Sequence, residues 1–600
     1  MAENEEKQEE KADIRVFRSL KPYLVKYRWH YFGGILCVVF VDGAQMVIPQ
    51  FIRRAINLIA LGDFLLRDII ILALGAVGTM ALIAGGRFLW RYFLHGASRR
   101  IEMELREKFF RHLMTLSYEF YQQNKIGDLM ARAINDLGAV RQAIGMGLVT
   151  MIDGVVMVAA ILAIIFVQDP RTAAFSVIPL PLITLLILLF GKMVGRKFFR
   201  TQETYSNMSD TVQETFAGVR VVKSFVKETW FIKKFADTNE DYQAANMVLV
   251  KIFSFFFPFI AFLSGLTALI LLLVGGGRVL DGSMGTGDLV ALFSYLQMLI
   301  WPLMGAGFMV NMIQRGAVSL ARINEVLDTK PGILSPETPR QPGKKAAANI
   351  IEIRNLSFAY PGGEPVLRDI NLSIERGSLL GILGRTGSGK STLIKTLVRM
   401  VDPPPGAVFV EGLAVGDWDL AELRGRFGVT PQDSYLFSDS IKRNIGYGLE
   451  SPAEEQLHRA VSLSAIDQDL KAFVQGWDTM IGERGLTLSG GQKQRVAISR
   501  ALVCEPDILV LDDSLSAVDA ETERRILDGL LEEMRNKTGI IISHRVSTLR
   551  YADKVAVLDQ GRITEYGSPA ELIARGGFFA KTAALQQLDQ NKVAGEAANG

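Results

Sequence analysis

The sequence predicts two domains in series: an α-helical membrane domain of six transmembrane helices with long cytoplasmic extensions, and then an α/β domain. Six long apolar runs lie in the first half of the 600-residue chain. The second half alternates short strand-like runs with helical patterns, which is typical of α/β domains. Apolar residues make up 49% of the chain and the net charge is only +3, so the basic stripe of a nucleic-acid-binding protein is missing.

The six apolar runs each approach or exceed the ~20 residues that a helix needs to cross the hydrocarbon core of a bilayer. Six buried helices of a large soluble protein are the alternative, but so many long apolar runs in one half of a chain favour a membrane protein. The lipid bilayer is therefore an expected partner. The runs cover Trp29–Ile48, Ile69–Trp90, Val149–Val167, Ala173–Val194, Val248–Val274 and Leu289–Val310.

The connections between these runs predict the orientation of the chain. The segments between the second and third runs and between the fourth and fifth are long, helical in pattern and basic, whereas the connection between the third and fourth is short. Positively charged segments stay on the cytoplasmic side, so both long segments and both termini are expected there. Arg53, Arg54 and Arg67 in the first outer loop are a weak signal against this orientation. We expect a multi-pass protein of the inner (plasma) membrane.

Changes in composition divide the chain into five parts. A proline- and lysine-rich stretch without apolar periodicity marks the main boundary. The predicted parts are a cytoplasmic tail with an amphipathic segment (1–27), the membrane domain (28–327), a linker (328–349), the α/β domain (350–588) and a polar tail (589–600).

A glycine-rich loop in the α/β domain matches a phosphate-binding pattern. The apolar run Ser378–Leu383 leads into it as a strand, and Thr392–Val401 is expected to follow as a helix. Backbone N–H groups and the helix N-terminus would bind phosphate oxygens, Lys390 would neutralise their charge, and the Ser391 hydroxyl would ligate Mg²⁺. A chance glycine-rich turn is the alternative. The candidate nucleotide-binding residues here are Gly384, Arg385, Thr386, Gly387, Ser388, Gly389, Lys390, Ser391 and Thr392.

Two acidic residues, Asp512 and Asp513, follow the apolar run Ile508–Leu511. This pattern predicts a buried strand with carboxylates at its C-terminal end, which is where ligands bind in open α/β sheets. Asp512 would hold Mg²⁺ through water. A core strand followed by a solvated turn is the alternative interpretation.

A third element lies between these two. Small residues at the start of a predicted helix, Lys493–Leu502, form a second candidate anion site. Because the phosphate loop already surrounds the phosphates from one side, this second site needs another nucleotide, or the far side of a nucleotide held by a second domain. Its residues are Leu488, Ser489, Gly490, Gly491 and Gln492.

These five residues, between the phosphate loop and the acidic strand, resemble the signature of ABC transporter ATPases. The chain is similar to an exporter-type half-transporter of that superfamily. In the membrane half, Gly127–Asp136 and Glu214–Glu228 resemble the two cytoplasmic coupling regions. The resemblance implies an α/β P-loop ATPase domain with an antiparallel subdomain and a helical subdomain, ATP and Mg²⁺ as ligands, and a second half-transporter chain that pairs head to tail with this one.

The resemblance also implies roles for single residues. Tyr360 resembles the aromatic residue that stacks on adenine, and Gln432 resembles the loop glutamine that reaches Mg²⁺. Asp519 lies in the loop that crosses the dimer interface in this family, and His544 resembles the switch histidine that contacts the γ-phosphate. Gly482–Gly485 resembles the exporter-specific loop that precedes the signature.

One position departs from the family pattern. A glutamate normally follows the strand aspartate and polarises the attacking water, but here the residue is Asp513. Its carboxylate is drawn back by roughly an ångström, and a misplacement on that scale can cost about 10²-fold in rate. Either Asp513 still serves in a slow homodimer, or the chain resembles the degenerate-site subunit of a heterodimeric bacterial multidrug exporter. We favour the heterodimer, in which the partner carries the glutamate and Leu488–Gln492 complete the partner's site.

The expected function is ATP-driven export of hydrophobic or amphipathic small molecules, with a weak ATPase site on this chain. A lipid flippase working as a homodimer is the main alternative, and an ATP-gated channel or regulatory receptor is an alternative of another class. Asp42 lies mid-span in the first helix. A charge inside a membrane is a functional hypothesis, so Asp42 could attract cationic cargo, although an internal pair between helices is the alternative.

Overall fold

The computed structural model of the chain describes residues 13–62, 65–343, 348–482, 488–533 and 537–599. It divides into two compact units. The first comprises the chain up to Thr115 together with Asn124–Thr329, and the second comprises Leu116–Gln123 together with the chain from Lys330 onward.

Within the described residues of the first unit, six helical segments are long and apolar enough to cross a membrane. Each contains one of the six predicted runs, which confirms the prediction. Glu228–Leu280 has 53 residues, or ~80 Å at 1.5 Å per residue, against the ~30 Å of a bilayer core. The predicted cytoplasmic extensions are therefore continuations of the membrane helices. The segments are Arg28–Leu61, Leu66–Leu113, Ile126–Gln168, Pro170–Ala217, Glu228–Leu280 and Thr286–Asp328.

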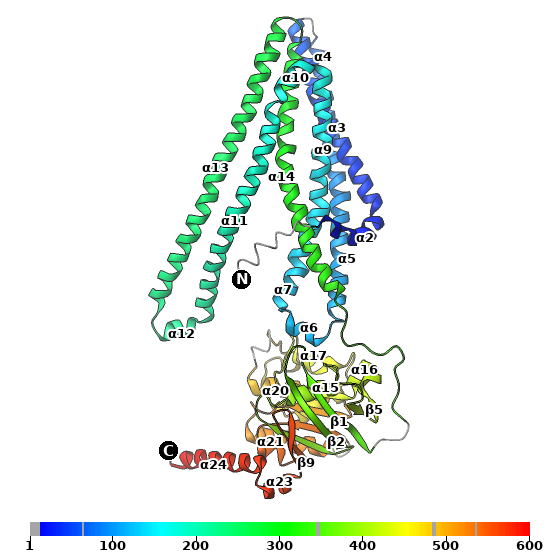
Figure 1. Cartoon of the computed structure of the whole chain (residues 1–600), viewed down its shortest axis with the longest axis vertical. Helices are drawn as coiled ribbons and strands as arrows, with labels where there is room; N and C mark the ends of the chain where they lie inside the picture. The colour runs from blue at the N-terminus through cyan, green and yellow to red at the C-terminus, as the bar shows by residue number, and fades with distance from the viewer. Residues whose placement is uncertain (1–12, 63–64, 344–347, 483–487, 534–536, 600) are drawn as a thin grey trace. The chain divides into compact units, whose positions relative to one another are not determined.

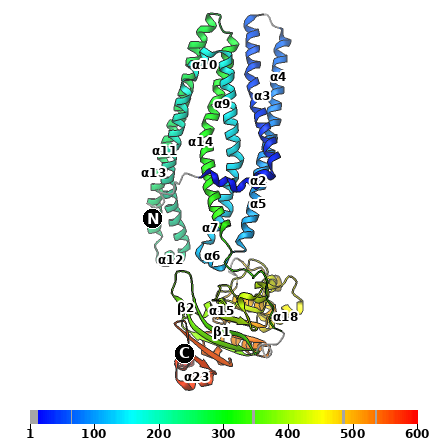
Figure 2. The same cartoon turned by 45° about the vertical axis from the view of Figure 1, so that its right-hand side comes forward.

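Some of these segments change helical type along their length. A π-helical turn, η3 (Arg91–His95), joins the second membrane helix to its extension, and two more π-helical turns interrupt the third segment. The helices α11 and α13 run side by side and are joined at one end by α12 (Figures 1 and 2). The first-unit helices are α2 (Lys21–Lys26), α3 (Arg28–Leu61), α4 (Leu66–Trp90), α5 (Gly96–Leu113), α7 (Ile126–Ala131), α8 (Leu137–Gln142), α9 (Leu148–Gln168), α10 (Pro170–Val177), α11 (Pro179–Ala217), α12 (Val219–Ser224), α13 (Glu228–Leu280) and α14 (Thr286–Asp328).

The second unit contains two sheets. One is antiparallel with strand order β2-β1-β4-β5, and the other has the order β10-β9-β3-β8-β7-β6 with parallel pairs from β9 to β6. The central strands β3, β7 and β8 of the larger sheet are buried along their whole length and are largely apolar, whereas the edge strand β10 is partly exposed. The strands are β1 (Asn349–Ala359), β2 (Pro365–Glu375), β3 (Leu379–Gly384), β4 (Val408–Val410), β5 (Leu413–Ala414), β6 (Phe427–Thr430), β7 (Ile508–Asp512), β8 (Thr538–Ile542), β9 (Lys554–Asp559) and β10 (Arg562–Gly567).

Side chains alternate between the two faces of the larger sheet. Leu380 and Ile382 of β3 pack into a core that also contains the antiparallel sheet, whereas Leu379 and Leu383 pack against helices on the opposite face. The predicted α/β domain with an antiparallel subdomain is therefore confirmed. The second-unit helices are α6 (Tyr118–Gln123), α15 (Lys390–Leu397), α16 (Leu420–Gly425), α17 (Ile441–Ile445), α18 (Glu454–Leu463), α19 (Asp467–Ala472), α20 (Gly490–Leu502), α21 (Ala520–Glu533), α22 (Val546–Leu549), α23 (Pro569–Arg575) and α24 (Phe578–Asn599).

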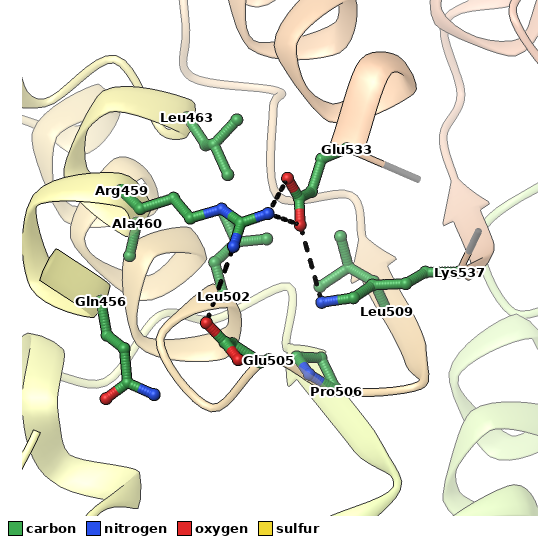
Figure 3. Close-up of a pocket in the computed structure, with 10 residues that line it drawn as sticks. All are labelled: Gln456, Arg459, Ala460, Leu463, Leu502, Glu505, Pro506, Leu509, Glu533 and Lys537. Atoms are coloured by element: carbon green, nitrogen blue, oxygen red, sulfur yellow. Dashed lines mark hydrogen bonds and ion pairs between the residues drawn. The ribbon is translucent and has the colours of Figure 1, made fainter. Parts of the chain in front are cut away.

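A helical subdomain, formed by α17 to α20 around its own apolar cluster, is held to the rest of the unit by ion pairs. Arg459 of α18 pairs with Glu533 at the end of α21 and with Glu505, and Lys537 approaches Glu533 from the other side (Figure 3). The hollow beside Arg459 measures about 20 Å³, which is room for about one water molecule. The hollow therefore belongs to the joint between subdomains and is too small for a ligand.

Three sequence expectations about the chain's segments can be compared with the structure. α14 ends at Asp328 and β1 begins at Asn349, the first and last residues of the predicted linker. The last helix, α24, runs to Asn599 and so passes through the segment that was expected to be a polar tail. The α15 helix stops at Leu397, four residues before the predicted end, because Arg399 adopts a left-handed backbone conformation with φ of 50°.

A buried polar cluster fixes the turn between the third and fourth membrane segments. Asp169 caps α10, where its carboxylate accepts hydrogen bonds from the Arg171 N–H at 3.2 Å and the Thr172 hydroxyl at 2.8 Å. The same carboxylate pairs with Arg278 of α13. One buried side chain therefore caps one helix and anchors another.

We expect Asp169→Ala to destabilise the first unit. It removes the cap and leaves Arg278 without its partner, and breaking a largely buried pair costs about 3 kcal/mol. Thermal unfolding of the purified chain in detergent, followed by tryptophan fluorescence, should show a midpoint several degrees lower. Asp281→Ala, at the exposed end of α13, is the matched control. A midpoint for Asp169→Ala equal to that control would contradict the anchoring role.

Candidate functional site

The predicted nucleotide-binding elements lie at one edge of the larger sheet. β3, β8, β7 and β6 run parallel, and their register pairs Ile382 with Ile542 and Asp512 with Ile542. The segments that follow these strands therefore emerge at the same level. They carry the phosphate loop after β3, His544 after β8, the acidic pair at the end of β7, and Gln432 after β6. Ligands bind at this edge in open α/β sheets.

The phosphate loop joins β3 to α15 through two glycines in left-handed conformations. Gly389 has φ of 101°, and a Cβ there would lie 2.8 Å from a Leu367 methyl group, so the position demands glycine. The Lys390 ammonium donates hydrogen bonds to the carbonyl oxygens of Gly384 and Arg385, both at 2.8 Å. The Ser388 hydroxyl is buried and has no hydrogen-bond partner among the described residues. The loop therefore contains the positively charged Lys390 ammonium group and a Ser388 hydroxyl that is available for a ligand.

The charged groups of this edge influence one another. Burial lowers the pKa of Lys390, and the carboxylates of Asp512 and Asp513 act in the opposite direction. Burial raises the pKa of Asp512, the carboxylate of Asp513 adds to that rise, and a hydrogen bond from Ser391 opposes it. A bound cation would favour the ionised form of Asp512, because opposite charges stabilise a buried carboxylate.

Asp513 and His544 contact each other directly. The His544 Nδ1 atom lies 2.9 Å from the Asp513 Oδ1 atom. The Asp513 N–H donates to the Ile542 carbonyl at 2.9 Å, and the residue has φ of 49°, a left-handed conformation that aspartate tolerates better than most residues. The two predicted catalytic side chains are therefore brought together from neighbouring strands.

The oxygen atoms at this edge fit a small hard cation. The Ser391 hydroxyl lies within hydrogen-bonding reach of the Asp512 carboxylate beside the phosphate loop, and Gln432 lies exposed on the loop after β6. Mg²⁺ prefers such oxygen ligands and usually completes its shell with water and substrate phosphates. Within the described residues there is no cluster of three or more His, Cys, Asp or Glu side chains that could hold a metal ion alone. The donor set fits a Mg²⁺ ion that a nucleotide and water help to ligate, which stays a prediction.

Tyr360 and Thr392 lie next to each other. The Tyr360 hydroxyl is 3.3 Å from the Thr392 Oγ1 atom, and its ring contacts Phe358 edge-on. Tyr360 follows β1 of the antiparallel sheet, whereas Thr392 is in the first turn of α15. The structure therefore brings the predicted adenine-stacking residue to the helix that follows the phosphate loop.

The predicted signature residues form the start of α20. Ser489 caps the helix, because its hydroxyl accepts from the Gln492 N–H at 3.3 Å while the Gln492 side chain accepts from the Ser489 N–H at 2.9 Å. Leu488 is buried, whereas Ser489 and Gly490 are exposed. Within the described residues no hydrogen bond or ion pair joins this motif to the phosphate loop of the same chain. The helix end is therefore presented to solvent, as a site for another molecule requires.

The loop that contains Asp519 packs on the signature helix. Gln494 of α20 donates to the Ser516 hydroxyl at 3.1 Å and accepts from the Ala517 N–H at 2.9 Å. Asp519 itself is exposed and accepts from the Thr522 N–H at 2.9 Å, which lowers its pKa. Of the predicted exporter-specific loop Gly482–Gly485, only Gly482 lies within the described residues.

Three side chains that position this site gave no signal in the sequence analysis. Asp469 of α19 accepts from Gln492 at 2.8 Å and so holds the signature helix. Gln586 of α24 donates to the His544 carbonyl at 2.7 Å and accepts from the Val546 N–H at 2.8 Å. Tyr118 of α6 contacts the Lys395 ammonium, 4.8 Å from its ring centroid. Each acts on a neighbour far away in sequence, which a local motif cannot reveal.

Asp42, the predicted cargo residue, is fully buried in α3. Neither of its carboxylate oxygens has a hydrogen-bond partner among the described residues. The Asp153 carboxyl of α9 lies close enough for a hydrogen bond if the two share a proton, and Arg87 of α4 is within electrostatic range. Arg87 donates to Gln45 at 3.2 Å. Asp42 therefore faces another acid, and both its role in cargo binding and the alternative of an internal pair stay predictions.

Comparison with known proteins identifies the class to which this fold and site belong. A family model described as "ABC transporter transmembrane region" matches residues 31–303, and one described as "ABC transporter" matches residues 367–516. A probable multidrug resistance ABC transporter of Bacillus subtilis, YheI, is 35% identical over 582 residues, which cover 96% of this chain and 98% of that protein. The multidrug resistance-like protein MdlA of Escherichia coli is 33% identical and covers 96% of this chain and 97% of its own length.

Two further relatives extend this picture. An ATP-dependent lipid A-core flippase of Syntrophus aciditrophicus is 32% identical and covers 87% of this chain and 86% of its own length. Among solved structures, a bacterial Atm1-family ABC exporter with ATP bound superposes with a TM-score of 0.75 at 26% identity, covering 93% of this chain and 98% of its own.

The chain therefore belongs to the ABC transporter family and joins an exporter-type membrane domain to an ATP-binding domain. It is an ATPase coupled to transport, and the predicted multi-pass inner-membrane location with a cytoplasmic ATP-binding domain is confirmed. ATP binding follows from the family, whereas Mg²⁺ and the roles of single residues remain predictions.

We expect Gln586→Ala to slow ATP hydrolysis without weakening ATP binding. Both Gln586 contacts are to the backbone around His544, so their loss should displace the histidine but leave the phosphate loop intact. A displacement of about 1 Å can cost up to about 10²-fold in rate. Steady-state assays should show kcat reduced at least several-fold at nearly constant KM, measured in whichever of the wild-type and Asp513→Glu chains turns over faster. Gln587→Ala, at the neighbouring exposed position, should behave like its parent, and an equal effect of the two variants would contradict the proposed role of Gln586.

Proposed function

We propose that this chain is one half of a heterodimeric exporter that uses ATP to move hydrophobic or amphipathic small molecules out across the membrane. The observation that carries this is an otherwise complete ATP site with Asp513 in place of the usual glutamate, next to an intact signature. In this assembly the partner chain supplies the catalytic glutamate. This chain's signature, Leu488–Gln492, completes the partner's site.

Each predicted residue has a definite task in the proposed site. The backbone of the phosphate loop and Lys390 bind the phosphates, and Tyr360 stacks on the base. Ser391 and Gln432 ligate Mg²⁺, Asp512 acts through a bound water, and the ion neutralises negative charge on the phosphate oxygens. Asp513 is the weak base, and His544 orients it and contacts the terminal phosphate. Asp519 lies in the interface with the partner chain.

Membership of the ABC transporter family supports a transport function, but the named relatives differ in the cargo that their names give. The multidrug resistance relatives favour small hydrophobic molecules, and the lipid A-core flippase relative supports a lipid-exporting homodimer as the second candidate. A channel or receptor on the same scaffold would pass ions or signal with ATP bound but not hydrolysed. Transport that requires turnover would exclude both.

The Asp42 environment favours a cationic cargo within this proposal. Two carboxyl groups, Asp42 and Asp153, meet in the membrane domain with Arg87 within electrostatic range. Neighbouring carboxylates cannot both ionise without cost, so the pair holds a proton or a cation. A cationic amphiphile could replace the proton.

The first test compares ATP hydrolysis by the purified chain alone with that of Asp513→Glu. We expect the wild type to be nearly silent and the variant faster by up to about 10²-fold, because the added methylene restores the carboxylate's reach. An additional substitution of His544 by Ala in the variant should abolish the gain. Wild-type turnover of ~1 s⁻¹ or more, an ordinary enzyme rate, would favour a homodimer in which Asp513 is competent.

Substitution of Asp42 tests the cargo proposal. Asp42→Asn keeps the shape of the side chain but removes its charge, so efflux of a cationic dye should fall several-fold while efflux of a neutral dye is retained. Transport by the complete transporter in proteoliposomes is the measurement, and Asp281→Asn, which removes an exposed carboxylate, is the control. Equal loss for both dyes would indicate a structural role for Asp42 in place of recognition.

A further inference from the structure

A basic cavity lies at the cytoplasmic end of the second membrane helix. Its volume is about 400 Å³. The lining side chains come from the junction of α4, η3 and α5, with one contribution from α8. They are Phe88, Arg91, Tyr92, His95, Arg99 and Arg141. None of them belongs to the ATP site or to the Asp42 pair.

The cavity gathers positive charge that the described residues neutralise only in part. The guanidinium groups of Arg91, Arg99 and Arg141 all lie within electrostatic range of the His95 ring. Arg141 pairs with Glu102 at 3.0 Å, but Glu102 also pairs with Arg106. Among the described residues, no ion pair is formed by Arg91 or Arg99, and both are exposed. Like charges held together repel each other, so the cluster favours an anionic ligand.

The helical geometry places these groups on one face. Phe88, Tyr92, His95 and Arg99 follow a spacing of three or four residues, which puts side chains above one another on a helix. The π-helical turn Arg91–His95 lies in the middle of this run. Such turns are frequent at functional sites.

The position along the helix matches the headgroup layer of a membrane. Apart from Arg87, α4 is apolar from Ile69 to Trp90, and Arg91 follows at once. The exposed aromatic side chains of Phe88 (68%) and Tyr92 (60%) stack on each other, and aromatic residues concentrate at membrane interfaces. The cavity therefore combines aromatic rings with guanidinium groups at the level where the apolar helix ends.

We propose that this cavity binds an anionic phospholipid of the cytoplasmic leaflet. Arg91, Arg99 and Arg141 donate hydrogen bonds to the phosphate oxygens, which guanidinium groups match in a bidentate manner. Phe88 and Tyr92 contact the glycerol and upper acyl region. Basic pockets at the cytoplasmic ends of membrane helices recognise lipid headgroups in this way. The lipid is a resident ligand, and the proposal is independent of the exported cargo and of the Asp513 site.

The test compares lipid retention by the purified chain. Native mass spectrometry after exchange into equal amounts of phosphatidylglycerol and phosphatidylcholine, without ATP, should show at least a threefold preference for phosphatidylglycerol. Arg91→Gln combined with Arg99→Gln should lose this preference. Lys108→Gln combined with Arg111→Gln removes the same charge from α5 outside the cavity and should keep it. Arg91→Lys combined with Arg99→Lys should give an intermediate preference, because it keeps charge but not the bidentate geometry.

Several outcomes would overturn the proposal. One is an unchanged preference in the glutamine variant, and another is equal loss in the control pair, which would indicate general charge attraction. Displacement of the lipid by millimolar inorganic phosphate would assign the site to a free anion. Loss of the retained lipid during ATP turnover would indicate cargo in place of a resident ligand. Unchanged ATP binding by the glutamine variant would show that this variant is folded. The lipid preference does not depend on the ATPase rate of Asp513→Glu, so this proposal and the proposed function can fail separately.

Discussion

The ATP site depends above all on the parallel register of β3, β8 and β7. Pairing of Ile382 with Ile542, and of Ile542 with Asp512, makes three strands end at one level. The phosphate loop, His544 and Asp513 therefore meet although they are separated by more than a hundred residues of sequence at the widest. A slip of one residue in this register would move each side chain to the opposite face of the sheet. The apolar cores on both faces prevent such a slip, so core packing is what fixes the catalytic geometry.

Local patterns were sufficient to predict the strands, the phosphate loop and the acidic pair, because each is encoded within a few consecutive residues. They could not predict what holds these elements in place. The Gln586 side chain that braces the backbone of His544 comes from the last helix, and its sequence neighbourhood is an ordinary helical pattern. The bond from Gln492 to Asp469 likewise joins two helices of the helical subdomain. Such contacts follow from packing, which a single sequence does not state.

In the membrane unit, too, the elements could be predicted from the sequence whereas their contacts could not, but for a different reason. Hydropathy reports the part of a helix that lies in lipid, so the six runs were found but not the full helices, whose polar continuations extend well past the bilayer. Hydropathy also cannot say what a buried charge faces. The structure places Asp42 opposite Asp153, another acid, and leaves its oxygens unbonded among the described residues. Asp42 differs in this from Asp169, whose carboxylate has a hydrogen bond from Thr172 and an ion pair with Arg278 that indicate a structural role.

The substitution at Asp513 changes one distance in an arrangement that is otherwise complete. His544 stands at the end of the neighbouring strand, so its position is set by the β7–β8 register and an aspartate still reaches it, at 2.9 Å. Because aspartate has one methylene fewer than glutamate, its carboxylate extends less far from the sheet, toward the place where the terminal phosphate and the attacking water would lie. A glutamate at this position would have two tasks, to contact the histidine and to polarise the water. An aspartate keeps the first task and weakens the second. In the proposed assembly this site would close on ATP but hydrolyse it slowly, which is the asymmetry that a pair of unequal half-transporters requires.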